Sequence, residues 1–142
     1  MGKELTVKKT LEIKADTLDV LDALINPEKI KKYFFGIDVI SDWKAGSPIL
    51  FQYVMEGKEF KDKGNILAIE PGRLLQYNYW SSYSGLEDKE ENYSIVTYKL
   101  EAKNGATILN LTQQGFASEQ AKEHAVNSWQ MVLENMKKLV EK

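Results

Sequence analysis

The sequence predicts an α+β domain in which a curved antiparallel β-sheet wraps around one long C-terminal helix. Residues 5–13 alternate between apolar and polar side chains, residues 37–111 form short alternating segments between glycine-bearing turns, and residues 118–140 carry apolar side chains at helical spacing. A sheet with one apolar face must be covered, and the last segment is the only one large enough to cover it. We expect a single domain over residues 1–142, since a chain of this length can bury one sizeable core.

The first strand is interrupted by one cation. Its apolar line consists of Leu5, Val7, Leu11 and Ile13. Lys9 falls on the same line, so it is either an edge residue whose stem lies along apolar surface or a cation that reaches into the interior.

Two short helices are predicted to follow this strand. Asp16 can accept hydrogen bonds from the free amides of a first turn, and Leu18, Leu21 and Ile25 follow at helical spacing. Asn26-Pro27 ends this helix, and Pro27 is also a favourable first residue for a second one. Three large side chains lie on one side of the second helix: Ile30, Tyr33 and Phe34.

The middle of the chain predicts a six-strand meander. Its turns are marked by Gly46, Gly57, Pro71-Gly72, Ser84-Gly85 and Asn104-Gly105. Connections of hairpin length pair each strand with its neighbour in antiparallel fashion. The acidic loop at residues 86–91 is the only connection long enough to be mobile.

The final segment is the clearest helix. At 100° per residue, one arc of about 140° holds Ala121, Ala125, Val126, Trp129, Val132, Leu133, Met136, Leu139 and Val140. At ~1.5 Å per residue this helix exceeds 30 Å, which is enough to cross a small sheet.

The composition excludes several kinds of function. The net charge is −2 and the charges are interleaved, which gives no electrostatic basis for binding nucleic acid. The chain has no cysteine and a single histidine, His124, which lies outside the apolar arc, so no cofactor and no metal are expected. No nucleophile elbow or phosphate loop is present. The paired acids stand in turns or in the acidic loop, where solvent makes them poor catalysts; they are Glu70, Glu87, Glu90 and Glu91.

We also expect no membrane insertion. The first residues lack an apolar leader core, and no window approaches the ~20 apolar residues of a membrane span. A cytoplasmic location follows by default.

Several stretches, taken in order, resemble one protein family. They are residues 24–34 (LINPEKIKKYF), 41–46 (SDWKAG), 64–71 (GNILAIEP) and 105–116 (GATILNLTQQGF), with Trp129, Leu133 and Leu139 in the last helix. The chain is similar to the helix-grip fold of the START and birch-pollen-allergen superfamily (SRPBCC). Within it, the chain resembles the branch named after the activator of the heat-shock-protein-ninety ATPase. Tyr33 stands where that branch usually has Trp, and Ala106 where it often has a second Gly.

The resemblance implies a cavity between the sheet and the long helix. Relatives include lipid carriers, hormone receptors, ring-closing enzymes and the co-chaperone domain, so it implies no single reaction. The candidate ligand-binding residues are mostly aromatic, because a tyrosine offers a flat apolar body and a hydroxyl. They are Tyr33, Phe34, Phe51, Tyr53, Tyr77, Tyr79, Tyr98, Gln113, Trp129 and Met136. A core that fills this space completely is the alternative.

Gln113 has two interpretations. Alternation points its amide inward after Leu109 and Leu111, where it would hold the polar end of a ligand. Alternatively the strand ends there and the amide meets solvent or backbone.

Three functional hypotheses follow. The first is a non-catalytic domain that binds a small hydrophobic or amphipathic molecule. The second is a cyclase-like enzyme in which the cavity orients a hydrophobic substrate and Lys9 or a tyrosine moves one proton. The third is contact with a chaperone, although the activator of the resembled branch carries an additional N-terminal domain that we do not expect here. Formation of a homodimer is left open.

Overall fold

The computed structural model describes residues 5–34, 36–81, 87–116 and 118–141. Its elements follow the predicted order: β1 (Thr6–Ile13), α1 (Thr17–Ile25), α2 (Pro27–Tyr33), β2 (Asp38–Ser41), β3 (Pro48–Met55), β4 (Lys58–Glu70), β5 (Leu74–Tyr79), the 3-10 turn η3 (Glu90–Asn92), β6 (Ser94–Lys103), β7 (Ala106–Gln114) and α3 (Glu119–Glu141). The expected turn at Ser84-Gly85 lies outside the described residues.

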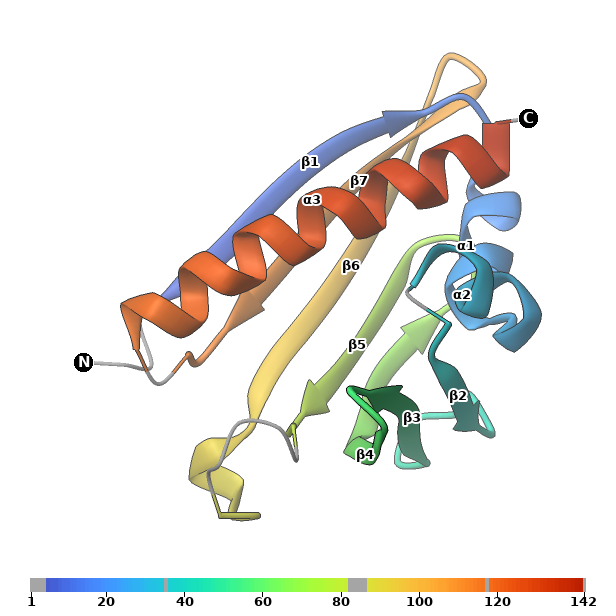
Figure 1. The fold of residues 1–142 in the computed structure, drawn as a ribbon. Helices are drawn as coiled ribbons and strands as arrows, with labels where there is room; N and C mark the ends of the chain where they lie inside the picture. The colour runs from blue at the N-terminus through green and yellow to red at the C-terminus, as the bar shows by residue number, and fades with distance from the viewer. Residues whose placement is uncertain (1–4, 35, 82–86, 117, 142) are drawn as a thin grey trace.

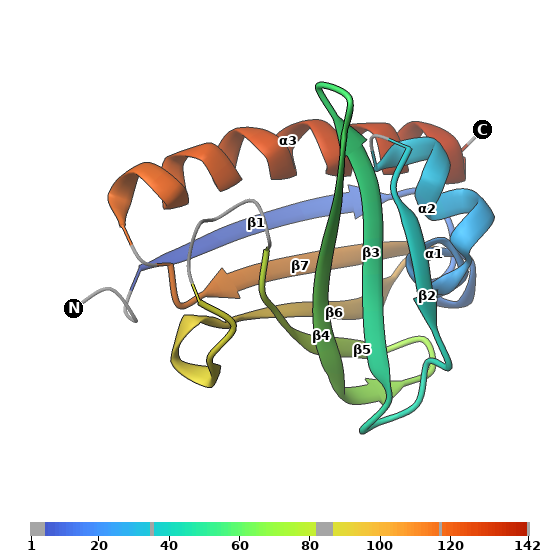
Figure 2. The ribbon, with the colours of Figure 1, turned by 60° about the horizontal axis from the view of Figure 1, so that its bottom comes forward.

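The strands form one antiparallel sheet in the order β1-β7-β6-β5-β4-β3-β2. The meander from β2 to β7 is therefore confirmed, and the first strand closes the sheet beside the last. Figure 1 shows α3 lying along β1 and β7, and Figure 2 shows β2, β3 and β4 running steeply across the direction of those two strands. The sheet thus curves around one side of the helix, which confirms the predicted α+β helix-grip architecture.

The two short helices begin where their capping residues predict. The Asp16 side chain accepts a hydrogen bond from the backbone N–H of Asp19 at 2.8 Å, which starts α1. Asn26 ends α1 and its side chain accepts from the N–H of Glu28 at 3.0 Å, while Pro27 takes the first position of α2. Both helices stand beside the C-terminal half of α3 (Figure 1).

The long helix is buried unevenly. Its fully buried residues, Trp129, Val132, Leu133 and Met136, begin in the middle of the helix. In the first half, Ala125 and Val126 are only half-buried and Ala121 is exposed. The predicted apolar arc is therefore wrong at Ala121, because the sheet does not cover the first turns of the helix as closely as its middle. Within the described residues, no helix is both long and apolar enough to span a membrane.

One glycine brings two strands unusually close together. A Cβ at Gly64 in β4 would lie 1.7 Å from the carbonyl oxygen of Asn78 in β5, so only glycine fits there. At the same place the Asn78 side chain accepts a hydrogen bond from the backbone N–H of Asn65 at 2.7 Å, which replaces a regular ladder bond. Asp62 and Tyr79 flank this irregular point.

Candidate functional site

The interior between the sheet and α3 has two ends of different character. We call the part beside α1, α2 and the C-terminal half of α3 the closed end. We call the part beside the N-terminal half of α3, where β5 ends and β6 begins, the open end (Figure 1). Side chains are fully buried at the closed end, whereas several aromatic side chains at the open end are half-buried.

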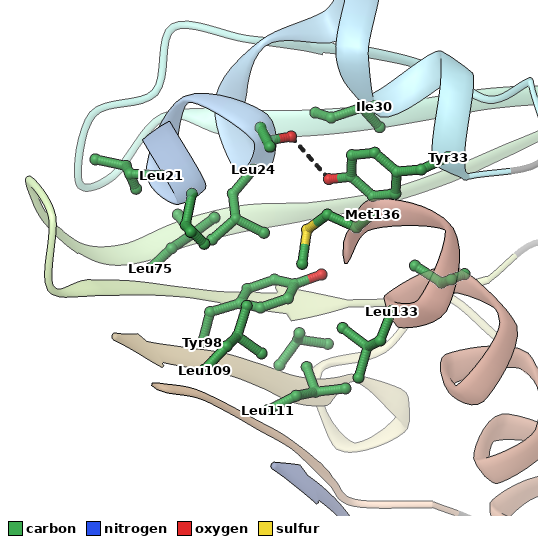
Figure 3. Close-up of a cluster of buried hydrophobic side chains, with 14 of the residues drawn as sticks. Leu21, Leu24, Ile30, Tyr33, Leu75, Tyr98, Leu109, Leu111, Leu133 and Met136 are labelled. Carbon is green, nitrogen blue, oxygen red and sulfur yellow. Dashed lines mark hydrogen bonds between the residues drawn. The ribbon is translucent and has the colours of Figure 1, made fainter. Parts of the chain in front are cut away.

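Apolar side chains and two tyrosines fill the closed end. Figure 3 shows Tyr33 from α2 and Tyr98 from β6 on either side of Met136, with Leu24 and Leu133 beside them. The Tyr33 hydroxyl donates to the carbonyl oxygen of Ala23 at 2.8 Å, so this polar group needs no ligand to satisfy it. A void of about 20 Å³ lies beside this cluster, and its lining includes Leu24, Tyr33 and Tyr98. A space of that size holds roughly one water molecule.

Aromatic rings extend this packing along the sheet. The ring centroids of Phe34 and Trp129 and those of Tyr98 and Trp129 are each 5.9 Å apart, both in edge-to-face geometry. Phe51 contacts Tyr77 at 5.7 Å and Tyr79 at 5.4 Å. These are ordinary distances for packed aromatic pairs. The expected ligand-sized hollow is therefore not confirmed, and the candidate residues instead contact one another.

Buried tyrosine hydroxyls lie close together in this core. Tyr77 and Tyr98 are hydrogen-bonded to each other. Burial raises the pKa of Tyr33, of Tyr77 and of Tyr98 above the ordinary value. All three therefore stay protonated near neutral pH and act as hydrogen-bonding groups, not as bases.

A row of polar side chains crosses the concave face at the open end. This polar belt consists of Tyr53 (β3), Asp62 (β4), Tyr79 (β5), Ser94 (β6) and Gln113 (β7). Each residue comes from the strand next to that of its neighbour in the row. A sheet face that meets a helix is normally apolar. Five polar side chains on adjacent strands therefore distinguish the open end from the mainly apolar closed end.

Asp62 is the one acid of the belt, and it is 2% exposed. Its carboxylate accepts hydrogen bonds from the Tyr53 hydroxyl at 3.1 Å and from the Tyr79 hydroxyl. Burial, and next the negative charge of Asp62, raise the pKa of Tyr79 well above its ordinary value. The arrangement is a carboxylate held in the interior by tyrosyl donors, which is how a buried charge becomes tolerable.

Gln113 joins the belt to the helix. Its amide nitrogen donates to Ser94 Oγ at 2.9 Å, and its amide oxygen accepts from Trp129 Nε1 at 2.8 Å. The Ser94 hydroxyl in turn lies 3.4 Å from the carbonyl oxygen of Tyr79. The prediction that the amide points inward is thus confirmed by its 7% exposure, while its partners are protein side chains and not the backbone or solvent of the alternative.

The structure places every candidate ligand-binding residue in the interior. The buried ones are Tyr33, Phe51, Tyr77, Tyr98, Gln113, Trp129 and Met136, and the half-buried ones are Phe34, Tyr53 and Tyr79. Sequence reasoning missed Asp62. Its signal was the alternation of Phe60, Asp62, Gly64 and Ile66 along β4, which puts the acid on the line of the core residues.

The remaining candidates for chemistry lie at the surface. Lys9 is half-buried and its Nζ donates to Oε1 of Gln130 on α3 at 3.2 Å, which agrees with a stem that lies along the helix. His124 is exposed, as predicted. Glu70 pairs with Arg73 at 3.4 Å. Among the described residues, no three acids or histidines are grouped so that they could hold a metal ion.

A larger hollow lies on the outer side of the sheet. This groove has a volume of about 500 Å³, and among its lining residues are Ile40, Leu50, Lys63 and Tyr93. Lys63 is paired with Asp88, which also accepts from the Tyr93 hydroxyl at 2.5 Å. Its lysine and its tyrosine are therefore already paired with Asp88, and the concave face remains the stronger candidate.

Known proteins of similar sequence or fold match most of the chain. The family model described as Activator of Hsp90 ATPase homolog 1-like protein matches residues 14–141. A solution structure from Cytophaga hutchinsonii is 38% identical with a TM-score of 0.85, over 99% of this chain and 97% of that chain.

More distant structures share the fold alone. The Aha1 dimer from Colwellia psychrerythraea is 16% identical, with a TM-score of 0.74 over 96% of both chains. CalU16 from Micromonospora echinospora is 23% identical, with a TM-score of 0.73 over 95% of this chain and 75% of that chain. No curated protein sequence matches.

Proposed function

The chain belongs to the Activator of Hsp90 ATPase homolog 1-like family, and from that premise we propose that it binds a small hydrophobic or amphipathic molecule at the open end of its concave face. The observation that carries the proposal is the polar belt beneath half-buried aromatic rings. Ligand sites typically combine an apolar, aromatic wall with a few well-placed polar groups. The open end supplies both, whereas the closed end is packed with apolar side chains and with tyrosines such as Tyr33, whose hydroxyl bonds to the backbone.

Binding requires side chains at the open end to move, because the polar groups there are already hydrogen-bonded to one another. Sites for drug-sized molecules need ~300 Å³ or more. The side chains that would move are the half-buried ones: Tyr53 and Phe60 on the β3–β4 hairpin, and Val126 on the first half of α3. Their outward rotation leaves the fully buried residues of the closed end, such as Met136, in place.

The geometry supports binding better than ring-closing catalysis. The buried tyrosines have raised pKa values, so their hydroxyls are poor proton acceptors near neutral pH. Asp62 accepts hydrogen bonds from the Tyr53 and Tyr79 hydroxyls, so a substrate proton would have to displace one of these donors to reach it. Lys9 donates to Gln130 on the helix surface.

A ligand screen tests the proposal. Thermal-shift and native mass-spectrometry measurements on lipids, sterols and polyphenols should reveal at least one compound that raises Tm and co-migrates with the protein. Val126→Trp, which fills the open end, should abolish this effect. Met131→Trp places the same ring at an exposed position of α3 and should leave it intact. Absence of any shift or adduct across the whole screen would overturn the proposal.

Assembly into a homodimer and contact with a chaperone are separate proposals. The Colwellia psychrerythraea structure is a dimer. Light scattering on the purified chain measures its mass in solution and so tests the homodimer. A pull-down with the ninety-kilodalton chaperone tests the chaperone contact.

A further inference from the structure

We propose that Asp62 makes the open end selective for ligands that donate a hydrogen bond, such as alcohols, phenols and amines, and that it excludes carboxylates. This inference rests on the proposed function and adds the chemical class of the ligand. Three features of the described residues support it: the burial of Asp62, the length of one of its hydrogen bonds and the position of the residue that makes it.

The first feature is a carboxylate on a face that otherwise packs rings. Asp62 lies opposite Phe51 in the β3–β4 register and is 2% exposed. A charge at such a position is stable only while strong donors point at it. The two tyrosyl hydroxyls do so, one from each adjacent strand. The carboxylate of Asp62 therefore accepts hydrogen bonds at this position. The hydroxyl groups of the two tyrosines donate to it and not to a ligand.

The second feature is the length of the hydrogen bond from Tyr53. The Tyr53 hydroxyl lies 3.1 Å from Oδ1 of Asp62, whereas O–H···O bonds are commonly about 2.7–2.8 Å long. The Tyr79 hydroxyl donates to the other oxygen, Oδ2. Of the two donors, Tyr53 is therefore the one that a competing hydroxyl or ammonium group can replace.

The third feature is the position of Tyr53 at the rim. Its ring is half-buried and stacks on Phe60 with centroids 5.5 Å apart. If this ring turns outward, the polar head of a ligand takes its place on Asp62. The apolar body of the ligand then lies against Phe60. Tyr79, which comes from the more central strand β5, continues to hold the carboxylate.

Carboxylate ligands fail at the same position for an electrostatic reason. A second negative charge within a few ångströms of Asp62 would be repelled strongly in a poorly solvated interior. Binding would also remove the ligand's carboxylate from water without supplying a hydrogen-bond donor to Asp62.

The test uses three ligands that share one chain length: dodecanol, dodecylamine and dodecanoate, each below its micelle concentration at about pH 7. Calorimetric titration of the wild-type protein should show the alcohol and the amine binding at least ~10-fold more tightly than the carboxylate, as expected for one charge-assisted hydrogen bond. Asp62→Asn, which removes the charge and adds a donor, should reduce this preference to within about threefold. Glu59→Gln makes the same charge change at an exposed position of β4 and should preserve it.

A second variant keeps the inference testable if Asp62→Asn does not fold. Tyr53→Phe removes the competing hydroxyl and retains the ring, so it should tighten alcohol and amine binding about threefold or more. A purely structural Tyr53 would give unchanged or weaker binding, which would count against the inference.

The outcomes separate the two proposals. If none of the three ligands binds the wild-type protein, and the broader screen is also silent, binding itself is refuted. If dodecanoate binds as tightly as dodecanol, or if Asp62→Asn leaves the preference unchanged, the selectivity is refuted while binding stands.

Discussion

The closed and open ends of the interior are built from the same sheet and the same helix, yet different interactions hold them together. The closed end is held mainly by apolar packing, and the open end by hydrogen bonds between buried polar side chains. At the closed end, Met136 and Leu109 are 0% exposed and pack against apolar neighbours. At the open end, Asp62 and Gln113 are nearly as buried, but each depends on specific hydrogen-bond donors or acceptors. A well-packed apolar end tolerates no empty space, whereas a polar end tolerates exchange of one partner for another. The comparison indicates that stability is concentrated at one end and recognition at the other.

The largest expected effect tests the stability half of this comparison. Met136→Ala should lower the free energy of unfolding by about 3 kcal/mol, because it leaves a cavity where α1, α2 and the sheet already fill the space. Val126→Ala, on the half-buried part of the same helix, should cost less than about 1 kcal/mol. Urea unfolding followed by circular dichroism measures both.

Equal losses for these two substitutions would contradict the division into ends. Met136→Leu serves as the matched control, since a swap that conserves volume should cost under about 1.5 kcal/mol.

The next effect concerns the link between the polar belt and the helix. Gln113→Leu keeps the volume but leaves the Trp129 Nε1–H without its acceptor, so it should cost about 2 kcal/mol. Trp129→Phe should also destabilise the protein. The double variant should lose less than the sum of the two, because no donor then remains unsatisfied. Strict additivity in the same urea experiment would show that this bond does not couple the helix to the belt.

The sequence predicted the architecture well because the patterns that encode it are local. Asp16 and Asn26 cap helices through side chains that reach only two or three residues along the chain. Alternation within a strand likewise depends on neighbouring residues alone. These signals needed no knowledge of how the sheet curves.

The site was predicted less completely because its shape depends on how closely side chains from different helices and strands pack in space. The space between the sheet and α3 is filled partly by Tyr33, whose hydroxyl reaches the carbonyl of Ala23 in the preceding helix. No pattern in the sequence fixes that packing. Asp62 was overlooked because its neighbours Lys61 and Lys63 suggested a solvated charged stretch, whereas its own position alternates with core residues.

The smallest expected effect is confined to one tyrosine outside the interior. Partial desolvation, and next the hydrogen bond to Asp88, raise the pKa of Tyr93 to about 12. Because the folded pKa lies above the unfolded value near 10, the associated stabilisation is complete below pH 10 and disappears as the pH rises toward 12. Asp88→Asn should bring the Tyr93 pKa back toward 10 with little change in Tm. Near-ultraviolet absorbance during alkaline titration, with Tyr93→Phe to assign the transition, measures it.

The same titration separates the interior tyrosines from this one. The pKa values of Tyr77, Tyr79 and Tyr98 are raised mainly by burial, so these side chains should ionise only as the protein unfolds, together with the loss of the circular dichroism signal. Their protonated hydroxyls contribute stability below pH 10 that is lost at higher pH. Ionisation of Tyr77, Tyr79 or Tyr98, assigned with the matching phenylalanine variants, while the dichroism stays native would mean that the interior opens to hydroxide without unfolding. The open end, where Tyr79 meets the half-buried rim, is where that opening should begin.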